Sequence, residues 1–300
     1  MQQQYDPRNA DIKVWVNGLR DRQQARVSVF DSAVQGGDAV WEGIRIYQGY
    51  AFLLEQHLDR LLESAHALAF AQVPDRQTIK EAIFATLQAN SMTDNAHIRL
   101  TLTRGEKITS GMDPRLNQAG CTLIVLAEHK PPVYDNAAGI KLITSAIRRN
   151  SPQFLDSKIH HNNLLNNILA KIEANVAGAD DAVMLDNQGF VAETNATNLF
   201  MVKKGTLYTP LPDACLPGLT RKLVLELAQE LHITSKEKNI SLTEFYNADE
   251  AFATGTMGEL TPIQEIDGRQ IRNQQEGSVL NQLQNHFRTK IPVYGVKLPF

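Results

Sequence analysis

The sequence lacks the features that mark a disulfide scaffold, a metal protein or a nucleic-acid-binding protein. Its two cysteines, Cys121 and Cys215, lie in apolar surroundings, so we expect reduced thiols and no disulfide framework. No cysteine or histidine pair has the spacing of metal ligands, because the adjacent His160 and His161 diverge on any regular element. A net charge of −3 argues against nucleic acid or an anionic membrane as the main partner.

Long apolar runs and internal repeats are also missing. The longest apolar run, near 123–127, is far shorter than the roughly 20 residues of a membrane span. The amino-terminal residues 1–7 have neither the basic nor the apolar region of a signal peptide. We therefore expect a cytoplasmic protein without a membrane segment. A chain of 300 residues with 43% hydrophobic content predicts two domains with packed cores.

The hydrophobic pattern predicts helices and strands without the regular alternation of a Rossmann fold. Helical spacing predicts helices at 55–70, after a cap at Asp75, after Lys158, at 220–231 and around 279–287. Alternation and short apolar runs predict strands at 14–16, 27–30, 44–47, 52–54, 97–103, 121–127, 140–145, 182–185, 190–193 and 199–202. Ser241 and Glu244 have the spacing of a capping box. The fold class that follows is α+β.

Two prolines mark the best candidate for a domain boundary. Pro131 and Pro132, within 130–136, stop both a helix and a strand ladder. We therefore predict an N-terminal α/β domain at 1–129, a linker at 130–136 and a C-terminal domain at 137–300. The helix after Lys158 should bury its large aliphatic side chains, which are Leu164, Leu165, Ile168, Leu169, Ile172 and Val176. Lys171 on that helix should lie at the surface.

A lysine and a carboxylate carry the chemistry. Lys158 precedes an Asn-rich amphipathic helix, and Glu193 ends a predicted strand. Pyridoxal phosphate chemistry needs such a pair, because an amine binds the cofactor aldehyde and an acid keeps the pyridine nitrogen protonated. Two turns offer backbone N–H groups to a phosphate: Leu219 and Thr220 begin a helix, and Thr256 follows a strand.

Seven motifs follow one another in the order found in a known family. They are Trp41-Glu42-Gly43-Ile44-Arg45, His57-Leu58-Asp59-Arg60-Leu61, His97-Ile98-Arg99, the Lys158 segment, Glu193 to Asn198, Leu216-Pro217-Gly218-Leu219-Thr220-Arg221 and Gly255-Thr256-Met257-Gly258-Glu259-Leu260-Thr261-Pro262. From about Val14 to Phe287 the chain resembles the class IV (fold type IV) aminotransferases, above all the branched-chain amino acid aminotransferases and their branched-chain-like relatives.

The resemblance implies a smaller N-terminal α/β domain, a C-terminal pseudo-barrel domain and pyridoxal 5′-phosphate as cofactor. Lys158 would be the catalytic residue, binding the cofactor as a Schiff base and moving the proton between substrate and cofactor; burial should lower its pKa. The implied cofactor contacts are Arg60, Lys158, Glu193, Leu219, Thr220 and Thr256. The implied substrate contacts are Trp41, Arg99 and Met257.

The implied reaction moves the amino group of L-leucine, L-isoleucine or L-valine to 2-oxoglutarate, so the partners are an amino acid and a 2-oxo acid. Arg99 matches the arginine of the family's Tyr-x-Arg element, with His97 in place of the tyrosine. Arg104 resembles instead the Thr-Arg-Gly arginine of D-amino acid aminotransferases. Residues 99 and 104 have opposite strand parity, and Arg99 lies away from the Ile98 core face, so Arg99 is the better candidate.

Three other functions stay open at this stage. A D-amino acid aminotransferase and a 4-amino-4-deoxychorismate lyase use the same fold and cofactor. A catalytically silent binding protein is disfavoured because Lys158, Glu193 and both phosphate turns are present. The family also implies a homodimer, in which a loop near 111–114 crosses to the partner subunit. In the family an Asn-Tyr pair follows the lysine, whereas this chain has Asn163 and Leu164 there after one extra residue.

Overall fold

The computed structural model describes residues 5–273 and 277–300, which form two compact units. The N-terminal unit contains the described residues up to Pro131 together with Ile159–Asn163 and Ile291–Phe300. The C-terminal unit contains Pro132–Lys158 and, apart from 274–276, Leu164–Lys290. The chain passes from the N-terminal to the C-terminal unit after Pro131, which lies within the predicted linker at 130–136. The predicted C-terminal domain, 137–300, differs from this division because Ile159–Asn163 and Ile291–Phe300 pack in the N-terminal unit.

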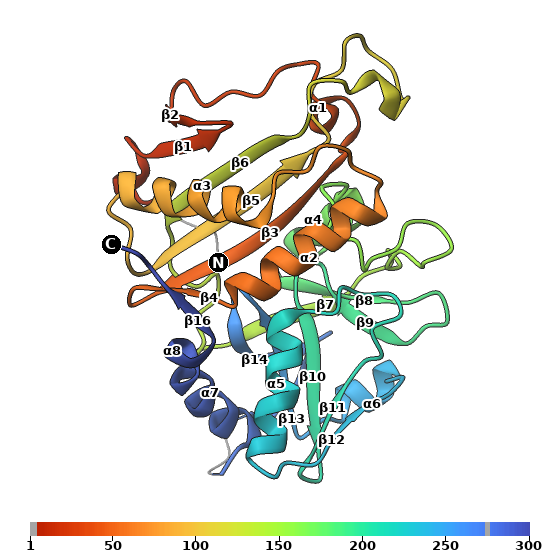
Figure 1. The fold of residues 1–300 in the computed structure, drawn as a ribbon. Coiled ribbons are helices and arrows are strands. Elements are labelled where there is room, and N and C mark those ends of the chain that lie inside the picture. Colours follow the sequence, from red (N-terminus) through yellow and green to blue (C-terminus); the bar gives the residue numbers. More distant parts are fainter. Residues whose placement is uncertain (1–4, 274–276) are drawn as a thin grey trace. The chain divides into compact units, whose positions relative to one another are not determined.

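An antiparallel sheet with two helices on one face forms the N-terminal unit (Figure 1). The strands run in the order β16-β4-β3-β5-β6-β1-β2. They are β1 (Lys13–Val16), β2 (Leu19–Asp21), β3 (Ala39–Tyr47), β4 (Tyr50–Phe52), β5 (Ala96–Thr103), β6 (Thr122–His129) and β16 (Gly295–Lys297). The helices are α1 (Ser32–Gly36), α2 (Leu54–Ala67), α3 (Arg76–Ala89) and α8 (Ile291–Tyr294), with 3₁₀ turns at Pro7–Asn9 and Pro114–Leu116.

Sequence patterns explain why α2, α3 and β5 meet in one core. Ile98, Leu100 and Leu102 alternate along β5 and are fully buried, as predicted. The four-residue spacing of Ile79, Ile83 and Leu87 forms the buried face of α3. Asp75 caps α3 by accepting the backbone N–H of Thr78 at 2.7 Å. These predictions are confirmed, whereas the strand predicted at 27–30 is wrong, because Leu19–Asp21 pairs with β1 instead.

The carboxyl-terminal segment packs on the N-terminal unit. The strand β16 pairs antiparallel with β4 at the edge of the sheet, with Val296 opposite Ala51. Before it, Leu53 donates its backbone N–H to the carbonyl of Tyr294 at 3.2 Å. Leu298 is buried in the same core as Leu54. The tail therefore covers an edge that would otherwise expose unpaired backbone groups.

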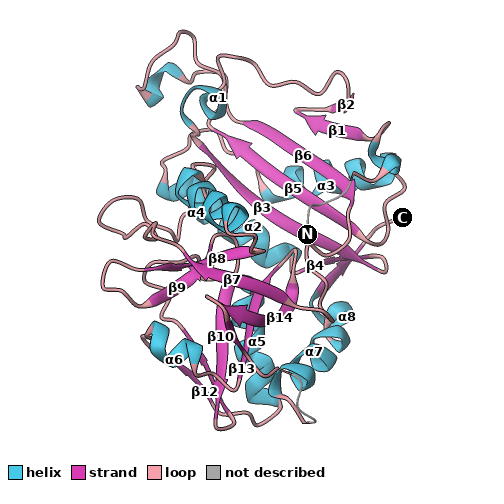
Figure 2. Ribbon diagram, turned by 180° about the vertical axis from the view of Figure 1, so that it is seen from behind, coloured by secondary structure: helices cyan, strands magenta, loops and turns pink. Residues whose placement is uncertain are grey.

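The C-terminal unit is built on a second, mixed sheet (Figure 2). Its strand order is β12-β11-β10-β13-β14-β7-β8-β9, with β15 paired to β14. The strands are β7 (Ile140–Thr144), β8 (Asp181–Leu185), β9 (Val191–Thr194), β10 (Asn198–Lys203), β11 (Thr206–Thr209), β12 (Ser235–Glu237), β13 (Glu250–Gly255), β14 (Glu259–Ile266) and β15 (Arg269–Gln270). The helices are α4 (Leu165–Val176), α5 (Leu219–Glu230), α6 (Leu242–Tyr246) and α7 (Val279–Thr289). The predicted capping box of Ser241 and Glu244 begins α6.

The helix after Lys158 exists, but its predicted buried face is wrong. Ala170 and Ala174 of α4 pack against β8 and are fully buried. The large aliphatic side chains are exposed instead, namely Leu165, Ile168, Leu169, Ile172 and Val176. Both charged side chains turn inward: Lys171 binds Asp181 at 3.1 Å, and Glu173 accepts the Ser145 hydroxyl at 2.5 Å. The exposed face of α4 is therefore a charge-free aliphatic stripe.

Candidate functional site

The C-terminal unit holds Glu193 between two polar side chains. Glu193, at the end of β9, is buried, and Arg149 donates its Nε–H to one carboxylate oxygen at 2.5 Å. Asn198 donates its amide to the other oxygen at 3.4 Å. Burial raises the pKa of Glu193, and the guanidinium of Arg149 opposes that rise. The carboxylate is thus held in one orientation by two donors.

Asn198 also connects Glu193 to the start of α5. Its amide donates to the carbonyl of Leu216 at 2.8 Å. Gly218 is the N-cap residue of α5 and has no side chain to cap the helix. A Cβ atom at Gly218 would collide with the side-chain oxygen of Asn198, so a larger residue there would displace Asn198 from its contacts with Glu193 and Leu216. The backbone N–H groups of the first helical turn, which begins at Leu219 and Thr220, are suited to an anion.

The other predicted residues of this unit lie on its turns. Lys158 is exposed, contrary to the expected burial, and its backbone N–H donates to the Asp156 carboxylate at 2.9 Å. Thr256 and Met257 form the turn after β13 and are half-buried. The carbonyl of Met257 accepts the N–H of Val133 at 2.9 Å, which fixes the turn to the linker.

In the N-terminal unit, Arg60 of α2 is paired with a buried glutamate. Its Nε–H and one Nη donate to the two carboxylate oxygens of Glu42 at 2.8 and 2.7 Å. Glu42, on β3, is completely buried. His57 and His160 also contact this carboxylate through their Nδ1 atoms, at 2.7 and 3.1 Å. The predicted phosphate contact is therefore one member of a cluster that sequence patterns did not reveal.

Trp41 and Arg99 lie together on the opposite face of the same strands. The register of β3 and β5 places Trp41 opposite Thr101 and Gly43 opposite Arg99. The guanidinium carbon of Arg99 lies 3.7 Å from the ring centroid of Trp41, a cation–π contact. Arg99 also donates to the side-chain oxygen of Asn162 at 3.1 Å. Burial lowers the pKa of Arg99 to about 10, so the side chain is a cation at neutral pH.

Arg45 and His97 add unsatisfied polar atoms to this face, and the sequence had not marked either residue as a substrate contact. Arg45 is only 1% exposed, and its Nε and one Nη have no hydrogen-bond partner among the described residues. The same holds for Nε2 of His97, which lies directly opposite Arg45. Burial, together with Lys130, Arg45 and Arg99, lowers the pKa of His97 to about 3. The other Nη of Arg45 donates to the carbonyl of Lys130. Because two N–H groups of this buried guanidinium still lack acceptors, this face is suited to an anionic ligand.

Arg104 has a different environment from Arg99. Its Nε and one Nη bind the carboxylate of Asp38, the former at 2.6 Å. The same guanidinium donates to the carbonyls of Leu68 and Ala69 at 2.8 and 3.1 Å. Its charge is thus compensated within the fold.

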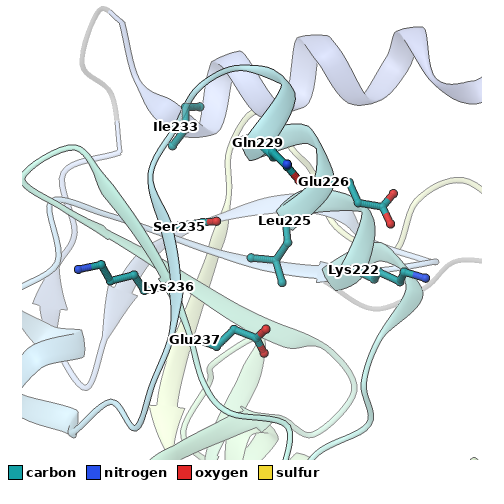
Figure 3. Close-up of a pocket in the computed structure, with 8 residues that line it drawn as sticks. All are labelled: Lys222, Leu225, Glu226, Gln229, Ile233, Ser235, Lys236 and Glu237. Carbon is teal, nitrogen blue, oxygen red and sulfur yellow. The ribbon is translucent and has the colours of Figure 1, made fainter.

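A groove of about 550 Å³ lies on the C-terminal unit, and none of the predicted site residues lines it (Figure 3). It is lined by α5, Ile233 and β12, and its lining includes the apolar Leu225 and the charged Lys222, Lys236 and Glu237. The lining carries both signs of charge, which favours neither an anion nor a cation. The described residues also contain no group of three or more His, Cys, Asp or Glu side chains that could hold a metal ion. Within 5–273 and 277–300, no helix has the length and apolarity to cross a membrane.

Comparison with known proteins identifies the family. Residues 39–266 match the model of the family Amino-transferase class IV. The chain belongs to the class IV aminotransferases. Branched-chain-amino-acid aminotransferase-like protein 2 of Arabidopsis thaliana is 60% identical over 98% of this chain. The match covers 53% of that protein, so this class IV aminotransferase spans about half the length of that relative.

Other relatives match over their whole length. A putative branched-chain-amino-acid aminotransferase of Methanocaldococcus jannaschii is 40% identical over 96% of this chain and 99% of its own. A branched-chain amino acid aminotransferase from T.th., solved in complex with N-(5′-phosphopyridoxyl)-L-glutamate, superposes with a TM-score of 0.88 at 30% identity. That match covers 96% of this chain and 99% of the solved one. The predicted family and the α+β, fold type IV class are confirmed.

Several residues that contact the predicted site residues were not identified from sequence. Glu42 and Arg45 stand in the same motif as Trp41, and Arg45 shares the strand parity of Trp41 and Arg99. That parity was a usable signal. No sequence signal pointed to the contact of Arg149 with Glu193 or to that of His160 with Glu42, because the paired residues lie 44 and 118 positions apart.

Proposed function

We propose that the chain is a pyridoxal phosphate-dependent aminotransferase that moves the amino group of L-leucine, L-isoleucine or L-valine to 2-oxoglutarate. When bound, the cofactor supplies an aldehyde that exchanges the amino group and a ring that accepts electrons. The family supports the reaction type. The observation that supports an amino acid and a dicarboxylate as substrates is the uncompensated positive face of Arg45 and Arg99 beside Trp41.

The residues of the C-terminal unit fit this cofactor. Glu193, held by Arg149 and Asn198, would face the protonated ring nitrogen, where a fixed carboxylate favours the positive charge. The N–H groups of Leu219 and Thr220 would bind the phosphate at the start of α5, with Thr256 as a further donor. The glycine required at position 218 supports this role because it leaves room beside Asn198. Arg60 is the arginine that we propose for the phosphate.

Lys158 is the residue that we propose to move protons. Its Nζ atom would hold the cofactor aldehyde and, once the substrate amine has displaced it, would carry the proton from the substrate Cα to the cofactor. The Lys158 side chain is exposed, which is compatible with a reactive amine that substrates can reach.

The substrate contacts that we propose combine charge with an apolar surface. Arg99 and the buried Arg45 would pair with carboxylates, because a guanidinium binds a carboxylate through two parallel hydrogen bonds. Trp41 and Met257 would offer apolar contact to a branched aliphatic side chain. A D-amino acid aminotransferase would need Arg104 for the carboxylate, but Asp38 and two backbone carbonyls already bind Arg104. No feature of the fold favours the lyase.

We also propose a homodimer in the cytoplasm. The charge-free stripe on α4 is self-complementary and can pack against its own copy across a two-fold axis. The loop that the family passes to the partner subunit, 111–114, presents an almost completely exposed Met112. Both surfaces leave large apolar side chains in water, which a second copy would cover.

Absorbance spectroscopy tests the proposed reaction. The purified chain mixed with pyridoxal 5′-phosphate should develop the absorbance of lysine-bound cofactor. L-Leucine should abolish that band, and 2-oxoglutarate should restore it. A band that responds to D-alanine and not to L-leucine would favour the D-amino acid aminotransferase. A chain that never develops the band is not a pyridoxal phosphate enzyme.

A further inference from the structure

Glu42 contacts two residues of the N-terminal unit: Arg60, which we propose for the cofactor phosphate, and His160, which follows Lys158 in the chain. We propose that Glu42 is a positioning residue that fixes the guanidinium of Arg60 and holds His160 in its Nδ1–H tautomer. The inference rests on the proposed function only where it takes Arg60 as the arginine that binds the cofactor phosphate.

The geometry at Glu42 is symmetrical. One carboxylate oxygen faces Nε of Arg60 at 2.8 Å and Nδ1 of His160 at 3.1 Å. The other faces an Nη of Arg60 at 2.7 Å and Nδ1 of His57 at 2.7 Å. Each oxygen therefore has one arginine N–H and one imidazole nitrogen as partners. Only an ionised carboxylate can accept from all four atoms at once.

The charges in the cluster determine the histidine tautomers. Burial opposes the charge on Glu42, yet His160 and Arg60 hold its pKa well below the ordinary value. Burial lowers the pKa of His160 to about 4 and lowers that of His57 as well. Both imidazoles are thus neutral at pH 7. A neutral imidazole can donate to a carboxylate through Nδ1 only if its proton is on that atom, which leaves Nε2 as an acceptor.

His160 extends the effect of Glu42 to the chain that follows Lys158. It is two residues beyond Lys158, and its ring lies 4.2 Å from the Trp41 ring, centroid to centroid. Its carbonyl accepts the Trp41 N–H at 2.9 Å, and its own N–H donates to the Ser64 hydroxyl at 3.1 Å. Glu42 therefore contacts both the proposed phosphate arginine and the segment attached to the proposed catalytic lysine.

The substitution Glu42→Gln keeps the shape of the side chain and replaces one acceptor oxygen with an NH₂ donor. On that side the amide would face an arginine N–H and an imidazole N–H, two donors that it cannot satisfy. The histidine on that side must move its proton to Nε2, so that its Nδ1 can accept a hydrogen bond from the amide NH₂. Arg60 loses one of its two hydrogen bonds to the side chain at position 42. We expect the tautomer of His57 or His160 to change. Pyridoxal 5′-phosphate should bind about tenfold more weakly or worse, the loss expected for a charge-assisted hydrogen bond.

The matched control is Asp31→Asn in the same unit. Asp31 is also completely buried, but within the described part of the chain it accepts only from neutral donors, including the hydroxyls of Thr103 and Thr122 at 2.8 Å each. This variant should lose stability as Glu42→Gln does, yet keep the cofactor affinity and the histidine tautomers. The comparison separates positioning from a general effect on the fold.

The first measurement is ¹⁵N NMR of the imidazoles in the cofactor-free wild type and both variants, and the second is the dissociation constant for pyridoxal 5′-phosphate. In the wild type, His160 should be protonated on Nδ1 and should not titrate between pH 5 and 8. A His160 that titrates near its ordinary pKa, or carries its proton on Nε2, overturns the inference. So does a Glu42→Gln variant that binds the cofactor as tightly as Asp31→Asn.

Two further variants decide the question if Glu42→Gln does not fold. Asparagine at position 160 places an amide N–H near the position of Nδ1, so His160→Asn should retain cofactor affinity. His160→Ala should lose it, and equal affinity of the two variants contradicts the inference. A wild type that never binds pyridoxal 5′-phosphate refutes the proposed function instead, because the imidazole tautomers are measured without cofactor.

Discussion

The arginines at 99 and 104 separate the proposed L-branched-chain activity from the D-amino acid alternative. Among the described residues, Arg99 is held only by the Trp41 ring and a neutral amide, so its charge is available to a carboxylate. Arg104 is bound by Asp38 and two backbone carbonyls. We predict that Arg99→Ala mainly lowers activity with the dicarboxylate, whereas Arg104→Ala mainly lowers stability.

The magnitudes follow from these environments. Loss of one charge-assisted contact to the acidic substrate costs about 1.5–3 kcal/mol, or about ten- to a hundredfold in kcat/KM. Arg99 is partly exposed, so its removal should change the free energy of unfolding little. Removing Arg104 leaves Asp38 and two carbonyls without their partner, and breaking such buried pairs costs roughly 3–5 kcal/mol. Because Asp38 is 29% exposed, the lower end of that range applies.

Single-turnover kinetics and urea unfolding measure the two effects separately. Each variant is assayed with L-leucine, D-alanine and 2-oxoglutarate, and its unfolding free energy is compared with the wild type. Arg99→Ala should slow the 2-oxoglutarate half-reaction more than the L-leucine half-reaction. If Arg104→Ala folds normally and abolishes activity while D-alanine is the preferred donor, the strand-parity reasoning is refuted.

Three other substitutions, one of them with a control, test separate properties of the chain. Lys158→Ala should remove the bound-cofactor absorbance and nearly all turnover; borohydride trapping that labels another lysine would contradict this assignment. Ile168→Glu should convert a dimer to a monomer in sedimentation without unfolding it, whereas Val293→Glu, at another exposed position, should not. His97 has a folded pKa of about 3 and an ordinary value of 6.5, so its neutral form stabilises the fold above pH 6.5. That stability falls as pH drops from 6.5 towards 3, and His97→Gln should flatten this part of the unfolding profile; an unchanged slope would count against it.

Local patterns predicted most elements of the fold because those elements depend on local rules. The alternation in β5 and the cap at Asp75 need only neighbouring residues, and both were correct. The outward orientation of α4 could not be predicted, because spacing defines an aliphatic stripe but not what covers it. Ala170 and Ala174 allow the helix to approach β8 closely, so the small residues form the buried face. The edge strand β16 depends on pairing with β4, more than 240 positions earlier.

Within the candidate site, sequence motifs identified the reactive groups but not the side chains that orient them. Lys158 and Glu193 could be selected because their chemistry is specific. Arg149 and Asn198 looked like ordinary polar residues, and only the fold brings them to Glu193. Arg45 could have been selected by its parity with Trp41, but only the structure shows that two of its nitrogen atoms are buried without partners among residues 5–273 and 277–300.

The segment after Lys158 explains how this chain can depart from the family pattern there. Ile159–Asn163 packs against β3: Trp41 donates its N–H to the His160 carbonyl at 2.9 Å, and Asn162 donates to the Ala39 carbonyl at 2.8 Å. Backbone pairing of this kind does not depend on side-chain identity, so the segment can change its side chains while keeping its place. Here those side chains include the imidazole that contacts Glu42 and the amide that accepts from Arg99. If the proposals for Glu42 and Arg99 hold, this short segment is where the cofactor and substrate preferences of the chain can diverge from those of its relatives.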